Sequence, residues 1–271
     1  MFRIVFHKVF IIHDKLCRQG LFYFNVYGTG TISIIYEDYY KYDKYQKGDL
    51  RMYTGNYECL ELFVKSDEGK RGSVLLKNVK ESTTETKELK HIYGNWIKFP
   101  VSRNTEYEIS TQDCTITFAY LSECENIMEN GICVLDTTDN YKEMNKEEFL
   151  RFIDTPYREQ YHFSPVVNWN NDPNGLCWFK GYYHLFYQLN PFGQEWNNMY
   201  WGHAASKDLM HWTHLPVALE PQEEILDNLA IKGGAFSGSA LPMGDEVYFY
   251  LTRHIGPQDD GWDTVQYQTM T

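Results

Sequence analysis

The sequence lacks several features that mark common classes of protein. It contains no apolar run of the roughly 18–20 residues that a membrane-spanning helix needs. It also has no block of about five like charges of the kind found in charged tails. The formal net charge of −12 gives a surface that repels phosphate backbones. We therefore expect neither a membrane protein nor a partner of nucleic acid.

Cysteine is sparse, with six among 271 residues, and no two stand in C-x-x-C spacing. This is too few for a disulfide scaffold, whereas free thiols fit a reducing compartment. The apolar N-terminus, MFRIVFHKVFIIHDKL, is interrupted by His7 and Lys8 and has no small-residue cleavage site, which argues against a signal peptide. These features predict a cytoplasmic protein.

Signals for metals and cofactors are missing as well. The GTG at Gly28–Gly30 lacks the rest of a dinucleotide fingerprint and is typical of a turn. His211 and His214 are three positions apart, but no carboxylate stands at metal-ligand spacing beside them. Ser237 lies in SGS rather than in G-x-S-x-G, which argues against a serine hydrolase. We expect no metal site and no cofactor.

Aromatic residues are abundant: 22 Tyr, 16 Phe and 7 Trp. Such a composition is typical of β-rich folds, and it also suits proteins that stack rings against sugars. Short strand-like segments separated by turn residues recur from residue 20 to residue 122 at intervals of roughly ten residues, a spacing that predicts an antiparallel β-sandwich. Because no titratable groups cluster there, we interpret residues 1–138 as an accessory domain, structural or weakly sugar-binding.

The composition changes over residues 139–160. NKEEFLRFID begins with Asn145 and has Glu148 three positions later, which is a capping-box pattern. This predicts a short helix that Pro156 ends, in a linker between two domains. From residue 161 to residue 271 strands return, with hairpins predicted at GLCWF–KG–YYHLFYQ and at GSALP–MGDE–VYFYLTRH.

The stretch VVNWNNDPNGLCWF, from Val166 to Phe179, is crowded with side-chain amides around Asp172. Pro173 restricts Asp172 to extended geometry, and Gly175 frees the next turn, so we place Asp172 at the end of a strand. Amides hold a carboxylate in its ionised form, in which it can act as a nucleophile. On NDPNG alone, an ordinary Asx-turn is the competing interpretation.

Four blocks follow one another in a fixed order: HFSPVVNWNNDPNG, YHLFYQLNPFGQEW, YWGHAASKDLMHW and AFSGSAL. Together they resemble glycoside hydrolase family 32, the β-fructosidases that include invertases, levanases and inulinases. The resemblance covers roughly residues 161–252. It implies a five-bladed β-propeller with a funnel-shaped pocket on its axis, and a retaining mechanism through a fructosyl-enzyme intermediate.

The resemblance also implies roles for individual residues. Asp172 corresponds to the catalytic nucleophile, while Trp201 and His203 of the WGHA block are expected to be supporting residues. The expected substrate-binding residues are Asn171, Gln188, Trp196, Phe236 and Ser237. Fructose offers hydroxyls for the amides and the serine, and a ring face for the aromatic side chains.

The sequence departs from the family after FSGS. The family carries a transition-state-stabilising aspartate in an RDP block and its acid/base glutamate in an EC block. RDP is absent here, and EC occurs at Glu58 and Glu123, before the nucleophile, where we take it as a chance match. At about 50 residues per blade, residues 161–271 provide about two blades. We therefore expect an all-β chain in which a sandwich-like domain precedes an incomplete propeller, the N-terminal part of a longer enzyme.

Two functions remain open from the sequence. One is a retaining β-fructosidase that acts on sucrose or a fructan, with Asp172 as the nucleophile. The other is a catalytically silent carbohydrate-binding fragment that lacks the acid/base group. The oligomeric state is left open.

Overall fold

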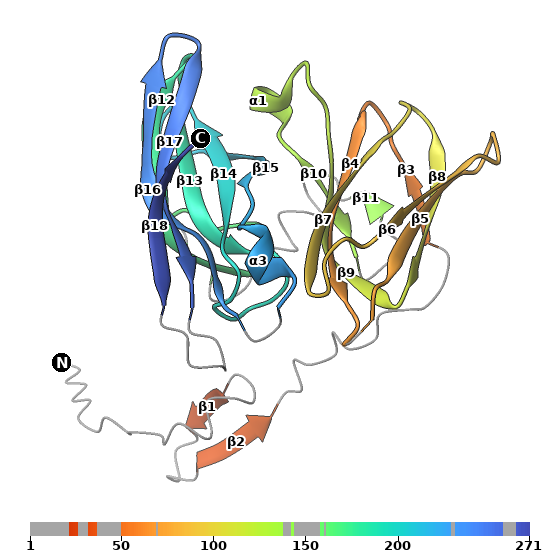
Figure 1. Cartoon of the computed structure of the whole chain (residues 1–271), viewed down its shortest axis with the longest axis horizontal. Helices are drawn as coiled ribbons and strands as arrows, with labels where there is room; N and C mark the ends of the chain where they lie inside the picture. Colours follow the sequence, from red (N-terminus) through yellow and green to blue (C-terminus); the bar gives the residue numbers. More distant parts are fainter. Residues whose placement is uncertain are drawn as a thin grey trace. The chain divides into compact units, whose positions relative to one another are not determined.

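The computed structural model describes residues 22–26, 32–36, 50–68, 70–137, 142–143, 158–159, 161–228, 231–256 and 264–271. The chain divides into two compact units, Met1–Gln46 and Lys47–Thr271. In the first unit, β1 (Phe22–Val26) and β2 (Ile32–Tyr36) form an antiparallel pair. The second unit contains four antiparallel sheets (Figure 1).

Two of these sheets face each other as a sandwich. The five-stranded sheet has the order β11-β10-β9-β4-β7, and the four-stranded sheet has the order β3-β8-β5-β6. Their strands are β3 (Leu50–Tyr53), β4 (Cys59–Ser66), β5 (Ser73–Asn78), β6 (Thr84–Glu88), β7 (Gly94–Pro100), β8 (Glu106–Gln112), β9 (Cys114–Ser122), β10 (Cys133–Asp136) and β11 (Lys142–Glu143). A short helix, α1 (Ile127–Asn130), precedes β10.

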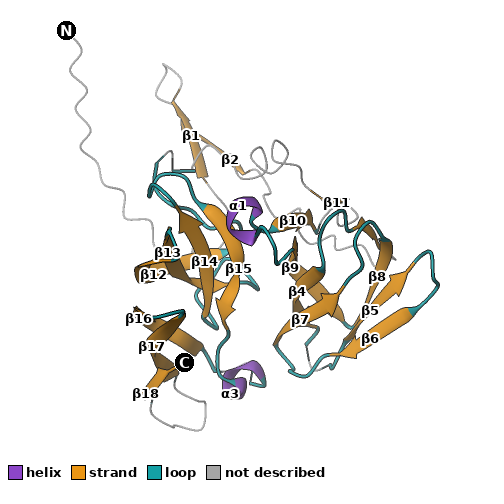
Figure 2. Cartoon of the chain, turned by 90° about the horizontal axis from the view of Figure 1, so that it is seen from above, coloured by secondary structure: helices purple, strands orange, loops and turns teal. Residues whose placement is uncertain are grey.

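The other two sheets have the form of propeller blades. The first is four-stranded, in the order β12-β13-β14-β15, and the second is three-stranded, in the order β16-β17-β18. Their elements are β12 (Trp169–Phe179), β13 (Tyr182–Asn190), β14 (Tyr200–Ser206), β15 (Thr213–Leu219), β16 (Gly233–Met243), β17 (Glu246–Ile255) and β18 (Val265–Met270), with helix α3 (Glu223–Leu226) between the sheets. Figure 2 shows the sandwich strands gathered on one side of this unit and the blade strands on the other.

The central strand β4 explains why the sandwich and the first blade share a core. Leu60, Leu62 and Val64 point into the sandwich, where they are fully buried with residues of both sheets. Phe63 points the other way and is equally buried, because it packs against the first blade. Since period-2 alternation sends neighbouring side chains to opposite faces, a strand buried on both faces needs apolar residues in succession, as Leu62, Phe63 and Val64 are.

The core between sandwich and blade is rich in aromatic rings. Its buried members are Phe63, Tyr93, Phe118, Tyr120, Val134, Val166, Tyr187, Leu189, Phe192, Tyr200, Val217 and Leu226. Phe63 lies at its centre, stacked on Trp96 with ring centroids 5.5 Å apart and meeting Tyr200 edge-on at 5.7 Å. A smaller cluster of Phe186, Trp201, Ala235 and Leu251 joins the two blades.

The predicted all-β class is confirmed, and so is the predicted hairpin at Lys180–Gly181. Both turn residues have positive φ, 46° and 86°, as a two-residue type I′ turn requires. The second hairpin turns more tightly than expected, with Gly244–Asp245 between β16 and β17. Between the two blades, helix α3 buries its Ile225 and Leu226.

Three further results concern individual expectations. The helix predicted from Asn145 lies outside the described residues. In the described part of the chain, no helix is long and apolar enough to cross a membrane. The five cysteines of that part (Cys59, Cys114, Cys124, Cys133 and Cys177) are free thiols.

Candidate active site

The strand that carries Asp172 is irregular. β12 is an edge strand, and its pairing with β13 shifts register between Asn170 and Pro173 and again between Asn174 and Cys177. In each interval three steps along β12 match two steps along β13, which is the count of a β-bulge. The expectation that Asp172 ends a strand is wrong, because it lies within β12 in the first bulge. Edge position and bulge together allow Pro173, which has no N–H to donate.

The bulge leaves Asn171 and Asp172 exposed beside the second blade. Gly175, with φ 49°, occupies the second bulge, and a Cβ there would lie 3.1 Å from both Ala240 and Phe186. The positive φ and the tight contact with Ala240 of β16 both favour glycine at this position. This contact brings the NDPNG segment against the FSGS segment.

Asp172 and Ser237 meet across the two blades. The Ser237 hydroxyl donates a hydrogen bond of 2.6 Å to Asp172 Oδ2. Such a bond orients the carboxylate, while the exposed face of Asp172 remains accessible. The arrangement provides an accessible, oriented carboxylate.

An aromatic wall stands next to this carboxylate. Trp196 is 40% exposed and meets Phe236 edge-on, with ring centroids 6.4 Å apart at 75°. Phe236 in turn stacks flat on His254, at 4.2 Å and 8°. Because Phe236 and Ser237 are consecutive on β16, the aromatic wall and the hydrogen bond to Asp172 come from one short segment.

Gln188 lies beneath the site and is 4% exposed. Its Nε2 donates 2.8 Å to the Ala235 carbonyl of β16. With the Asn174 amide in the orientation that satisfies both of its groups, the Asn174 oxygen accepts from Gln188 Nε2 at 2.9 Å. Trp201, fully buried, adds a hydrogen bond of 3.0 Å from its Nε1 to the same Ala235 carbonyl. Gln188 and Trp201 therefore tie the first blade to the strand that carries Phe236 and Ser237.

His203 and His184 form a second layer of support on the first blade. His184 Nδ1 lies 3.0 Å from His203 Nε2, and His184 Nε2 lies 3.2 Å from the Phe179 carbonyl. The carbonyl requires the proton on His184 Nε2, so His203 Nε2 donates to His184 Nδ1. Burial lowers the pKa of His203 to about 3, and the neighbouring His184 adds to the lowering. Burial also lowers the pKa of His184, and His203 stacks on Phe186 with ring centroids 4.3 Å apart.

The structure brings the six residues expected from the sequence to one region of the two blades. Five of them (Asn171, Asp172, Trp196, Phe236 and Ser237) lie at or near the exposed face, whereas Gln188 is buried beneath it. Sequence reasoning missed Asn174 and His254. Asn174 stands inside the quoted NDPNG, but nothing in the sequence distinguishes His254 from a surface histidine.

A cavity of about 390 Å³ in this unit lies elsewhere. It is lined by β7 and by the segment around α3, including Trp96, Lys98 and Glu223, and none of the expected site residues borders it. We place the site at Asp172 because the accessible carboxylate and the aromatic wall are there. Within the described residues, no cluster of three His, Cys, Asp or Glu side chains is arranged to hold a metal ion.

An accessible carboxylate fixed by a hydroxyl, beside aromatic side chains on the adjoining sheets of an all-β fold, is a type of site that suits a carbohydrate ligand. Residues 162–271 match the model of the N-terminal domain of glycosyl hydrolases family 32. This confirms the resemblance found in the sequence motifs.

Curated relatives match short parts of the chain closely. A levanase of Bacillus subtilis is 56% identical over 90 residues, 33% of this chain and 12% of that protein. An extracellular exo-inulinase of Aspergillus niger is 65% identical over 66 residues, 24% of this chain and 12% of that protein. A sucrose-6-phosphate hydrolase of Zymomonas mobilis is 39% identical over 125 residues, 46% of this chain and 23% of that protein. The chain thus spans less than a quarter of the length of these relatives.

One solved structure resembles more of the chain. A glycoside hydrolase family 32 protein from Bifidobacterium adolescentis aligns with a TM-score of 0.73 and 34% identity, over 82% of this chain and 37% of that one. An overlap of 82% is more than residues 162–271 could supply alone, so the match includes sandwich strands as well as blades.

Proposed function

We propose that this chain provides the nucleophile half of a β-fructosidase site, in which Asp172 attacks a terminal β-fructofuranosyl group of sucrose or a fructan. The observation that carries the proposal is the 2.6 Å hydrogen bond between Ser237 Oγ and Asp172 Oδ2. It joins the two motifs in one exposed site. The names of the relatives, levanase, exo-inulinase and sucrose-6-phosphate hydrolase, support a fructoside as substrate.

The chemistry follows from the geometry of retaining glycosidases. Asp172 forms a bond to the anomeric carbon while the bond from that carbon to the leaving oxygen breaks. The leaving oxygen takes a proton from a second carboxyl group, and water later releases the sugar from Asp172. Trp196 and Phe236 offer apolar area to the sugar ring, and Asn171 offers an amide to its hydroxyls.

The second carboxyl group is the missing part. The two EC pairs of this sequence are in the sandwich, where each glutamate already has a partner. Glu58 forms an ion pair of 2.9 Å with Arg103, and Glu123 accepts 2.5 Å from Asn130 Nδ2. Neither is available as the acid that faces Asp172, which supports taking them as chance matches.

The missing acid keeps a second function under consideration, that of a sugar-binding protein without hydrolytic activity. Purified 271-residue chain incubated with sucrose and with levan separates the two. Release of fructose that Asp172→Asn abolishes supports the β-fructosidase. If no fructose is released but levan binds, and Trp196→Ala weakens the binding, the chain is a carbohydrate-binding protein instead. If the chain neither cleaves nor binds these sugars, both functions are wrong for it.

The domain division, with an accessory sandwich before a catalytic propeller, and the cytoplasmic location remain part of this proposal. Localising a tagged chain in its native host would check the second of these.

A further inference from the structure

The loop between β13 and β14 carries Trp196, and the sandwich contacts this loop directly. Loop residues 191–198 lie between Asn190, the last residue of β13, and the buried Met199 that precedes β14. Trp196 is exposed at its tip, whereas Phe192 is 5% exposed and Asn198 is 1% exposed. The loop is therefore buried near both of its ends and exposed to solvent at Trp196.

Two hydrogen bonds run from the sandwich to this loop. Thr117 Oγ1 of β9 donates 2.9 Å to the Pro191 carbonyl. Asn197 Nδ2 donates 2.8 Å to the hydroxyl of Tyr93, which lies just before β7. The second bond involves the residue next to Trp196, so it restrains the backbone that sets the position of the indole.

Packing adds to these bonds. The Phe192 ring meets Tyr93 edge-on at 5.8 Å and Phe63 at 6.2 Å. A Cβ at Gly94 would lie 2.5 Å from the same ring, so the first residue of β7 is in close contact with the loop. Interiors this dense transmit displacements, because no free volume absorbs them.

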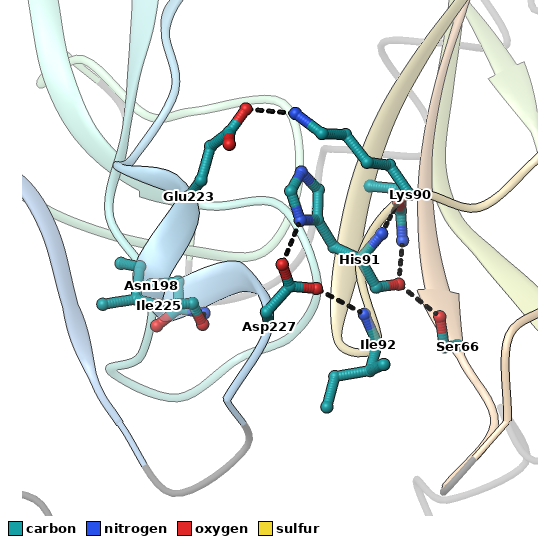
Figure 3. Close-up of polar contacts among 9 residues, drawn as sticks. Ser66, Lys90, His91, Ile92, Asn198, Glu223, Ile225 and Asp227 are labelled. Carbon is teal, nitrogen blue, oxygen red and sulfur yellow. Dashed lines mark hydrogen bonds and ion pairs between the residues drawn. The ribbon is translucent and has the colours of Figure 1, made fainter.

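A third path runs through α3, as Figure 3 shows. Asn198 Nδ2 donates 3.2 Å to the Ile225 carbonyl of this helix. The segment around α3 is itself fastened to the sandwich: Lys90 pairs with Glu223, and Asp227 Oδ1 accepts 3.3 Å from the Ile92 amide. Loop residues 191–198 are thus connected to the sandwich directly and through α3.

We propose that the sandwich acts as a positioning module for the sugar site, with Tyr93 and Thr117 as positioning residues that set the place of Trp196. The inference rests on the proposed function for its link to sugar, but the position of the loop can be measured without it. It gives the accessory domain a role in substrate affinity beyond covering the blade.

The test uses the 271-residue chain labelled with 5-fluorotryptophan. The fluorine resonance of Trp196 is identified by its loss in Trp196→Phe. Tyr93→Phe removes the hydroxyl that accepts from Asn197 and should shift or broaden this resonance. Tyr53→Phe is the matched control, because it removes a sandwich tyrosine hydroxyl that donates to Asn104 at 3.2 Å, and it should leave the resonance unchanged. Gly94→Ala, which displaces Phe192, provides a second perturbation.

Titration with fructose supplies the functional arm. We expect Tyr93→Phe to raise the Kd for fructose about threefold to tenfold, the range of one lost hydrogen bond, and Tyr53→Phe to leave it unchanged. A Trp196 resonance that stays in place in both Tyr93→Phe and Gly94→Ala overturns the proposal. So does a displaced resonance with unchanged fructose affinity. The unsubstituted chain could bind no fructose while the Trp196 resonance still shifts in Tyr93→Phe and Gly94→Ala. In that case the proposed function is wrong for this chain, but the positioning of the loop by the sandwich is supported.

Discussion

Ser237 Oγ and Asp172 Oδ2 lie 2.6 Å apart, although 65 positions separate the two residues in the chain. Asp172 lies in the first of the two bulges of β12, and Ser237 lies on β16 of the second blade. The contact connects the hydroxyl of Ser237 in the FSGS block directly to the carboxylate of Asp172 in the NDPNG block.

Ser237→Ala should lower kcat/KM for sucrose by about tenfold. Hydrogen bonds to charged groups contribute about 1.5–3 kcal/mol, and the lower end applies because this site is exposed. The measurement is fructose release by the 271-residue chain. Ser239→Ala, on the same strand and also exposed, is the control and should have little effect. Equal losses in the two variants would contradict a specific role of the Ser237 hydroxyl.

Tyr120→Phe should lower the free energy of unfolding by about 2 kcal/mol. The fully buried Tyr120 hydroxyl donates 3.0 Å to the carboxylate of Glu61 and accepts 3.1 Å from the amide of Val217 on the blade. Removing the hydroxyl leaves the Glu61 carboxylate and the Val217 amide each without one hydrogen bond. Leaving a buried polar group unsatisfied costs about 1–3 kcal/mol of folding free energy. Urea unfolding measures the difference, with the exposed Tyr53→Phe as a control. A loss in the control as large as in Tyr120→Phe would refute the explanation.

Acid should destabilise the protein through His203. The folded pKa is about 3, against an ordinary value of 6.5. Between these values the unfolded chain binds a proton that the folded chain does not, so stability rises with pH. The contribution of His203 to the free energy of unfolding is fully present above pH 6.5. It is lost as the pH falls toward 3, at up to about 1.4 kcal/mol per pH unit.

His203→Gln tests this pH dependence. Gln keeps a donor for His184 Nδ1 but cannot take up a proton in this range. Unfolding free energies measured between pH 4.5 and pH 7 should therefore show a shallower slope than in the unsubstituted chain. The surface variant His162→Gln should retain the original slope. Parallel profiles for His203→Gln and the unsubstituted chain would disprove the assignment.

Gly202→Ala should destabilise the first blade. A Cβ at Gly202 would lie 2.3 Å from the ring of Tyr187 on β13, and Tyr187 is itself buried. Forcing extra volume into a packed core costs about 1–3 kcal/mol. Gly193→Ala is the control, since nothing lies within 4 Å of a Cβ built there. Thermal melting compares the two, and an equal change in Tm would rule out the steric explanation.

Local patterns predicted much of the secondary structure. The Lys180–Gly181 turn was readable because few residues tolerate positive φ at two successive positions. The alternation of strands and turns predicted the sandwich, and the NDPNG and FSGS blocks identified the residues of the candidate site. Each of these patterns is formed by residues close together in the sequence, so it can be recognised without the tertiary fold.

Other features depend on contacts between distant segments. The bulges of β12 arise from the mismatch between two paired strands, so no single stretch of sequence encodes the position of Asp172 within its strand. Likewise, the short helix at Glu223–Leu226 is stabilised by burying Ile225 and Leu226, which a mostly polar loop sequence does not predict.

The sequence by itself determined which types of side chain are available: a carboxylate among amides, followed later in the chain by aromatic residues. It could do so because side-chain type is set residue by residue. Only the tertiary structure decided which of these groups meet. It placed Ser237 on Asp172, His254 beneath Phe236, and Tyr93 of the sandwich against the loop of Trp196. These pairings depend on how sheets pack, and packing is a property of the whole core rather than of any segment.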